Sequence, residues 1–240
     1  MEDGLVFSAL TLRPRFFSSF FYCRFSFQSL FSFFQCDVLN RGFSGYTTDL
    51  ADRLAFEWAF NSDQQPLFVT VFFGANDAAL PFSVQHVPVE RYRDNLTTIV
   101  RRLKSKWPNL TILLISPPPV DDEKWRRNCA NMISNRLKEN TRLYRNAAAD
   151  VAQDEKTIFV DLFDGRFDDM ARLLNDGLHL TEAGNEVLFR AVLEKLPDQV
   201  LTTEPAFPHC KNKKSVCFVV VNFFPFFTPG AKLFENKLGE

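Results

Sequence analysis

The chain has 240 residues, of which 46% are hydrophobic and 24% are charged, and its formal net charge at pH 7 is -1. This length and apolar content suffice for one α/β domain with a core of ordinary size and some additional sequence. Because the net charge is close to zero, the chain has no electrostatic footprint for nucleic acid or an acidic membrane surface, and we expect neither as a partner.

Residues 1–35 differ in composition from the rest of the chain. They contain ten of its 28 phenylalanines, without a helical or alternating period. Arg24, Gln28 and several serines interrupt the apolar run over residues 16–35, which argues against a membrane span, and no small-residue cleavage site follows to indicate a signal peptide. Phe, Ser and Leu have largely pyrimidine codons and a glutamine codon ends the tract at Gln35. We therefore hypothesise that this segment includes retained intron or an incorrect gene model, which the transcript sequence tests.

From Cys36 onward the sequence has the pattern of a folded domain with alternating strands and helices. In chain order it predicts a strand over 37–40, a helix over 50–60, a strand over 66–73, a helix over 88–107, a strand over 111–115, helix with room for one break in the 30 residues from 122, a strand over 157–162, a short helix over 168–174 and a helix over 181–196. Thr47 or Thr48 is suited to cap the first helix and Thr181 the last.

This alternation predicts an α/β fold with a right-handed, doubly wound parallel sheet, in which ligands bind at the carboxyl ends of the strands. Residues 205–240 change character again, with a basic run at 211–214 and an apolar stretch over 216–227. That stretch is too short to span a bilayer, so we expect a disordered or loosely docked tail.

Asp176 and His179 are the strongest candidates for chemistry. An imidazole can take and return a proton near neutral pH if a partner fixes its tautomer, and the turn over Gly177 can bring the carboxylate to one ring nitrogen. An Asp three residues from a His is more often a capping or surface pair, so this signal is weak alone. Of the other histidines, His86 fits a loop and His209 belongs to the atypical tail.

Two further loops lie at the predicted carboxyl edge of the sheet, and they carry Gly45 and Asn76. Taken singly, Gly45 fits a turn glycine and Asn76 an Asx-turn residue after a strand. Ser44 and Ser116 also lie near strand ends, and we interpret them as a turn hydroxyl and a strand-end residue rather than nucleophiles.

Three blocks occur in a set order: residues 40–46 (Asn-Arg-Gly-Phe-Ser-Gly-Tyr), 74–77 (Gly-Ala-Asn-Asp) and 175–180 (Asn-Asp-Gly-Leu-His-Leu). They resemble the second, third and last blocks of the SGNH (GDSL-type) hydrolases, and within them the isoamyl acetate-hydrolysing esterase-like group. The resemblance covers residues 36–204 and implies a three-layer, flavodoxin-like α/β fold. Both atypical ends lie outside it.

The resemblance implies hydrolysis of a small carboxylic ester, with an acetyl or other short acyl group, through an acyl-enzyme. Asp176 would orient His179, His179 would deprotonate a serine, and the Gly45 N–H and the Asn76 amide would hold the oxyanion. No cofactor and no metal are implied. The five cysteines are odd in number and share no metal-ligand spacing, so we expect reduced thiols in a cytoplasmic protein.

The first block of the family, a strand ending in Gly-Asp-Ser, is absent from this sequence. It would supply the nucleophile and the first, central strand of the sheet, so residues 36–204 correspond to an N-terminally truncated domain with that strand missing or replaced. Ser8, which follows a short apolar run, is a weak candidate for the nucleophile. Residues 5–10 are the candidate for filling the gap, which would otherwise leave two inner strand edges unpaired.

Two alternatives to a working esterase follow from the missing block. The chain is then either a non-catalytic relative that binds an acyl ligand or a partner, or a membrane-tethered protein that uses its Phe-rich ends. An activity-based probe for serine nucleophiles distinguishes the first alternative, and fractionation with lipid tests the second. The sequence leaves the oligomeric state open.

Overall fold

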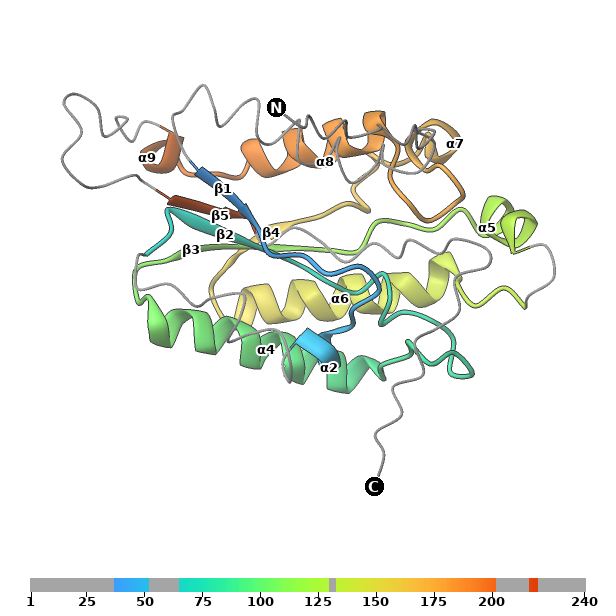
Figure 1. The fold of residues 1–240 in the computed structure, drawn as a ribbon, viewed down its shortest axis with the longest axis horizontal. Helices are drawn as coiled ribbons and strands as arrows, with labels where there is room; N and C mark the ends of the chain where they lie inside the picture. The colour runs from blue at the N-terminus through green and yellow to red at the C-terminus, as the bar shows by residue number, and fades with distance from the viewer. Residues whose placement is uncertain (1–36, 52–64, 130–132, 202–215, 220–240) are drawn as a thin grey trace, which may run out of the picture.

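The structure of the chain, a computed structural model, describes residues 37–51, 65–129, 133–201 and 216–219. Figure 1 shows helices on both sides of a layer of strands. The elements are β1 (Asp37–Asn40), α2 (Thr48–Leu50), β2 (Phe68–Phe72), α4 (Val89–Lys106), β3 (Thr111–Ile115), α5 (Asp122–Asn128), α6 (Lys138–Asp154), β4 (Ile158–Val160), α7 (Met170–Leu173), α8 (Glu182–Leu193), α9 (Asp198–Leu201) and β5 (Val216–Val219).

The central sheet has the strand order β2-β3-β4, and both strand pairs are parallel. All five residues of β2 are buried, as expected for a strand covered on both faces. Alternate residues of β2 enter different cores: Val69 and Val71 pack with the α4 and α6 side, while Phe68 and Phe72 pack with α8. This confirms the predicted doubly wound arrangement.

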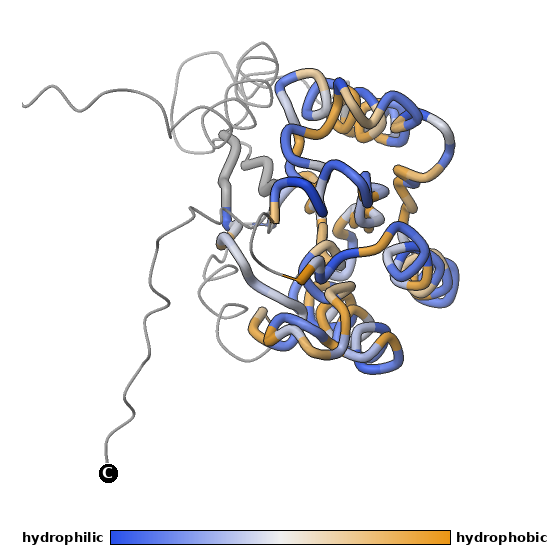
Figure 2. The backbone as a smooth tube through the Cα atoms, turned by 90° about the vertical axis from the view of Figure 1, so that its right-hand side faces the viewer, coloured by the Kyte–Doolittle hydropathy of each residue, from blue (hydrophilic) through white to orange (hydrophobic). Residues whose placement is uncertain are grey.

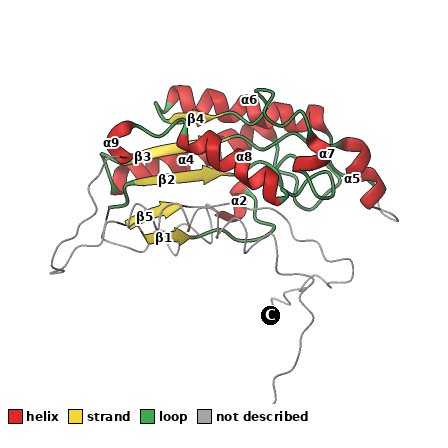
Figure 3. Ribbon diagram, turned by 90° about the horizontal axis from the view of Figure 1, so that it is seen from above, coloured by secondary structure: helices red, strands yellow, loops and turns green. Residues whose placement is uncertain are grey.

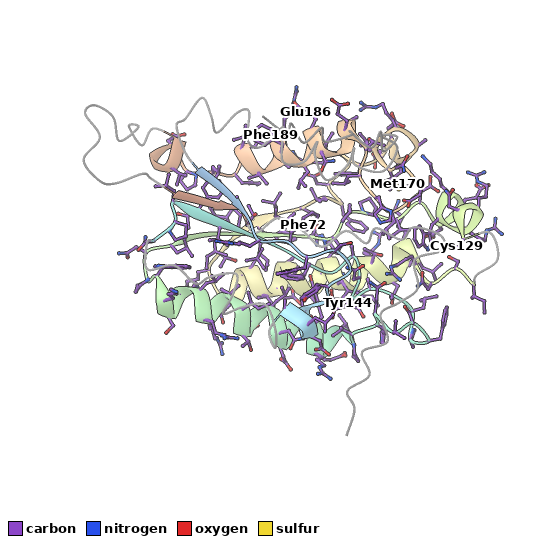
Figure 4. The ribbon with its side chains drawn as sticks, viewed as in Figure 1. Phe72, Cys129, Tyr144, Met170, Glu186 and Phe189 are labelled. Carbon is purple, nitrogen blue, oxygen red and sulfur yellow. The ribbon has the colours of Figure 1, made fainter. Side chains whose placement is uncertain are left out.

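The two cores differ in what covers them. Tyr144 of α6 lies in one core, and Phe72 of β2 and Phe189 of α8 lie in the other (Figure 4). Polar and apolar residues alternate along the helices around the sheet (Figure 2), which is the pattern of helices with one buried stripe. None of the described helices is both long and apolar enough to cross a membrane.

Helix boundaries agree with the sequence in part. The Thr181 hydroxyl accepts a hydrogen bond from the Gly184 N–H at 3.1 Å, so the predicted cap of α8 is confirmed. The helical stretch predicted from residue 122 onward is broken once, between the end of α5 at Asn128 and the start of α6 at Lys138. At the start of α2, however, Thr47 is the N-cap residue but its side chain makes no capping hydrogen bond. The Thr48 hydroxyl donates to the Asp77 carboxylate instead. The predicted helix over 50–60 lies largely outside the described residues.

Strand β5 comes from the predicted tail and pairs in parallel with β1, with Phe218 opposite Leu39. It also contacts β2, and it lies between β1 and β2 in Figures 1 and 3. Within the tail over 205–240, which we expected to be disordered or loosely docked, residues 216–219 thus pair with a strand edge that would otherwise be open. Residues 5–10, the expected substitute strand, lie outside the described residues.

Candidate active site

The Asp176–His179 turn connects α7 to α8. Its ends are held by an antiparallel bridge between Leu174 and Leu180 and by a 2.7 Å hydrogen bond from the Asn175 N–H to the His179 carbonyl. Within the turn, Asp176 Oδ1 accepts the backbone N–H groups of Leu178 at 3.0 Å and His179 at 2.9 Å. The other carboxylate oxygen, Oδ2, is hydrogen-bonded to His179 Nδ1. The carboxylate therefore orients the imidazole and directs Nε2 away from the turn.

The electrostatics of the turn favour an ionised aspartate. Burial by itself raises the pKa of Asp176, but the hydrogen bond and charge of His179 and the two backbone N–H groups together bring the pKa below its ordinary value. The side chain of His179 is 14% exposed. A carboxylate that stays ionised beside a largely covered imidazole is the arrangement in which a histidine can act as a general base.

Helix α5 holds this turn from the outside. The Asp121 N–H donates to the Gly177 carbonyl at 2.9 Å, and the Asn128 amide donates to the Asp176 carbonyl at 3.1 Å. Gly177 has φ +100, and a Cβ there would lie 2.5 Å from the Trp125 backbone nitrogen. Only glycine fits at this point, because both the backbone angle and the contact with α5 exclude a side chain.

Gly45 and Asn76 follow β1 and β2 respectively, and the structure brings their loops together. Asn76 is 1% exposed, and its Nδ2 donates to the Tyr46 carbonyl at 2.8 Å. Gly45 adopts φ +78, and its carbonyl accepts from Gln85 Nε2 at 3.1 Å. The residue after Gly45 is thus hydrogen-bonded to the side chain of Asn76, so the two predicted site residues belong to one cluster.

Asp77 also belongs to this cluster, although the sequence analysis did not identify it as a site residue. It is fully buried and accepts from the Thr48 N–H at 2.8 Å, the Thr48 hydroxyl at 2.6 Å and the Gly74 N–H at 3.2 Å. Burial raises the pKa of Asp77 to about 6, although its hydrogen bonds to Thr48 and Gly74 act in the opposite direction. It joins the start of α2 to the loop that carries Asn76. The only sequence signal was its place after Gly74-Ala75-Asn76.

A chain of contacts connects His179 to the Asn76 loop. The Trp125 ring meets the His179 ring edge-on at 6.2 Å between centroids, and Trp125 Nε1 donates to Asn135 Oδ1 at 3.4 Å. The Asn135 carbonyl in turn accepts the Leu80 N–H at 2.9 Å. Figure 1 shows α5 and α7 at one end of the molecule, toward which the parallel strands point. All three predicted blocks therefore lie at the same edge of the sheet.

The remaining sequence candidates have other positions. Ser116 is fully buried and its hydroxyl accepts the Leu162 N–H at 2.9 Å, and Ser44 is exposed in a turn. His86 Nδ1 contacts the Ala79 carbonyl at 2.6 Å within its loop. Ser8 and His209 lie outside the described residues. Within the described ranges, no three His, Cys, Asp or Glu side chains are grouped so as to hold a metal ion.

Comparison with solved structures agrees with this architecture. The crystal structure of an acetyl xylan esterase, AlAXEase, superposes with a TM-score of 0.54 and covers 75% of this chain and 90% of that chain, at 16% identity. At such low identity the similarity concerns the fold alone.

Comparison with sequences identifies the family. An Arabidopsis thaliana GDSL esterase/lipase is 36% identical over 189 residues, which are 71% of this chain and 76% of the relative. The human isoamyl acetate-hydrolyzing esterase 1 homolog is 43% identical over 166 residues, 65% of this chain and 66% of its own length. The model of the GDSL-like Lipase/Acylhydrolase family matches residues 22–187. The chain therefore belongs to the GDSL-like lipase/acylhydrolase family, whose members include esterases.

Proposed function

We propose that this protein hydrolyses a small carboxylic ester, with an acetyl or another short acyl group, by a Ser-His-Asp mechanism. The observation that carries the proposal is the hydrogen-bonded Asp176–His179 pair at the same sheet edge as Asn76 and Gly45. The similarity to a human isoamyl acetate-hydrolyzing esterase homolog supports the choice of a short acyl group. We assign the activity to a domain over residues 36–204 and, from the odd number of cysteines, a cytoplasmic location.

In the proposed reaction, His179 Nε2 takes the proton of a serine hydroxyl while the serine oxygen attacks the ester carbonyl carbon. Asp176 stabilises the imidazolium that forms. The resulting oxyanion accepts hydrogen bonds from the Gly45 N–H and the Asn76 amide. When the carbon–oxygen bond of the ester breaks, the imidazolium protonates the departing alcohol, and water then hydrolyses the acyl-serine by the same steps.

The serine nucleophile of this mechanism has no assigned residue among the described parts of the chain. The sequence has no Gly-Asp-Ser block, and Ser8 is the candidate that the sequence offers. The absence of that block is also the observation that favours a second function, in which the protein binds an acyl ligand without hydrolysing it. A fluorophosphonate probe separates the two functions, because covalent labelling requires an activated serine and ligand binding does not.

The test of the oxyanion role is Asn76→Ala, assayed with p-nitrophenyl acetate. Loss of one oxyanion donor typically raises the barrier by about 3 kcal/mol, so kcat should fall about a hundredfold. Asn140→Ala is the control, because Asn140 also donates to a carbonyl of this loop, that of Ala78, at 2.7 Å. An active wild-type chain whose kcat is unchanged by Asn76→Ala would reject the role.

A further inference from the structure

Arg136 is a charged side chain in an unusual environment. It is 1% exposed and lies on the segment between α5 and α6. In the part of the chain that the structure describes, its hydrogen-bond acceptors are neutral oxygens and no carboxylate pairs with it directly. Burial lowers the pKa of Arg136 to about 10, partly offset by the nearby charge of Asp77, so the group is still a cation at neutral pH. Such burial is unfavourable unless the hydrogen bonds compensate for it.

The acceptors of Arg136 lie on both loops that carry the proposed oxyanion donors. Its Nε donates at 3.1 Å to the carbonyl of Ala75, the residue before Asn76. Its second terminal nitrogen donates at 2.8 Å to Gln85 Oε1, and Gln85 Nε2 then donates at 3.1 Å to the Gly45 carbonyl. One guanidinium therefore reaches the Asn76 loop directly and the Gly45 loop through a single amide.

The orientation of the Gln85 amide follows from its two partners. An arginine side chain only donates hydrogen bonds and a carbonyl only accepts them. The Gln85 oxygen must therefore face Arg136, and the Gln85 nitrogen must face Gly45. Neither partner permits the flipped amide, so the relay from Arg136 to Gly45 has one arrangement.

We propose that Arg136 and Gln85 are positioning residues that hold the Gly45 and Asn76 oxyanion donors at a fixed separation. This inference rests on the proposed function and deepens it. Oxyanion donors act only when they lie about 2.7–3.1 Å from the oxygen that becomes charged, so small movements of either loop weaken them. Gly45 and Asn76 lie outside regular secondary structure, so side-chain hydrogen bonds fix the positions of their loops, and the bond from Asn76 to the Tyr46 carbonyl is one of them. The Arg136–Gln85 relay adds a second connection, which joins the carbonyl of Ala75 to the carbonyl of Gly45.

A positioning role predicts a change in kcat without a change in KM, since the oxyanion charge develops only in the transition state. A residue that merely holds the fold together would lower stability instead. Arg136 itself is too deeply buried for a clean test, because its removal leaves buried carbonyl groups without donors. Gln85 is half-buried and separates the two roles.

The variant that tests the relay is Gln85→Glu. A carboxylate at this position keeps its hydrogen bond to Arg136 and adds opposite charge, so the free energy of unfolding should not decrease. It cannot donate to the Gly45 carbonyl, and the two oxygens repel each other. With p-nitrophenyl acetate we expect kcat to fall about tenfold, as for the loss of one hydrogen bond near a charge, with KM unchanged within about twofold. Asn140→Ala removes the side-chain donor to the Ala78 carbonyl, which lies in the Asn76 loop but outside the relay, and it should leave kcat and KM unchanged.

A second readout does not depend on turnover. In protein labelled with 15N-asparagine, the side-chain amide protons of Asn76 report the hydrogen bond to the Tyr46 carbonyl. Gln85→Glu should accelerate their exchange with solvent about fivefold or more, because loosening the Gly45 loop moves its acceptor. Asn140→Ala should not accelerate it.

The outcomes separate this inference from the proposed function. Faster Asn76 exchange in Gln85→Glu supports the positioning role even if the wild-type chain hydrolyses no ester, and in that case only the proposed esterase activity is rejected. Unchanged exchange overturns the positioning role whether or not the chain is active. In an active chain, a fall in kcat that simply parallels a loss of stability also overturns it.

Discussion

Substituting Gly177 by alanine tests whether α5 holds the Asp176–His179 turn in place. The new Cβ would lie 2.5 Å from the Trp125 backbone nitrogen and 2.7 Å from the Asp121 carbonyl oxygen, at φ +100. These two backbone atoms are hydrogen-bonded to each other in the first turn of α5, so neither can move alone. Backbone strain of about 1–3 kcal/mol and overpacking of about 1–3 kcal/mol predict a total loss of about 2–6 kcal/mol in the free energy of unfolding.

The matched control is Gly165→Ala, which has almost the same backbone angle, φ +99, but meets only the Asp168 carboxylate at 3.6 Å. It should lose only the strain component, about 1–3 kcal/mol. Urea unfolding of both variants, followed by tryptophan fluorescence, measures the difference. Equal losses for the two variants would refute the close packing of α5 on the turn. A larger loss for Gly177→Ala, accompanied by slower ester hydrolysis, is the expected result.

Two further predictions concern stability. The pKa of Asp77 is raised from 3.8 to about 6, so its contribution to stability is complete below about pH 4 and is lost as the pH rises through 6; this amounts to about 3 kcal/mol. The free energy of unfolding of wild type minus that of Asp77→Asn should therefore fall by this amount between pH 4 and pH 7, and a constant difference would contradict the assignment. Phe218→Pro removes a backbone N–H from β5, opposite Leu39 of β1, and should lower the urea midpoint by the equivalent of about 1 kcal/mol or more, whereas Phe218→Leu keeps that N–H. Equal midpoints for these two variants would show that the strand pairing contributes nothing in solution.

Local patterns in the sequence were sufficient for much of the domain. The apolar run over residues 66–73 predicted a strand buried on both faces, because only a parallel sheet with helices on each side leaves no exposed face. All of β2, Phe68–Phe72, is buried in this way. Thr181 predicted the start of α8, because its hydroxyl satisfies an N–H group that the helix itself cannot. The pairing of Asp176 with His179 was also predictable, since three residues and a glycine bring the two side chains together within one turn.

Other features were outside the reach of sequence patterns because they depend on residues far apart in the chain. The pairing of β5 with β1 joins Val216 to Asp37, and no local periodicity records which strand edge is open. Asp77 gains its raised pKa from burial, which the sequence does not encode at a single position.

The family blocks, the alternation of strands and helices, and the Asp176–His179 pair could all be predicted from local sequence patterns, because short-range geometry controls each of them. The burial of Arg136, and the hydrogen bonds that join its guanidinium to the Ala75 carbonyl and, through Gln85, to Gly45, became visible only in the folded chain. A basic residue in a loop normally lies in water, and its burial follows from the loops that surround it after folding.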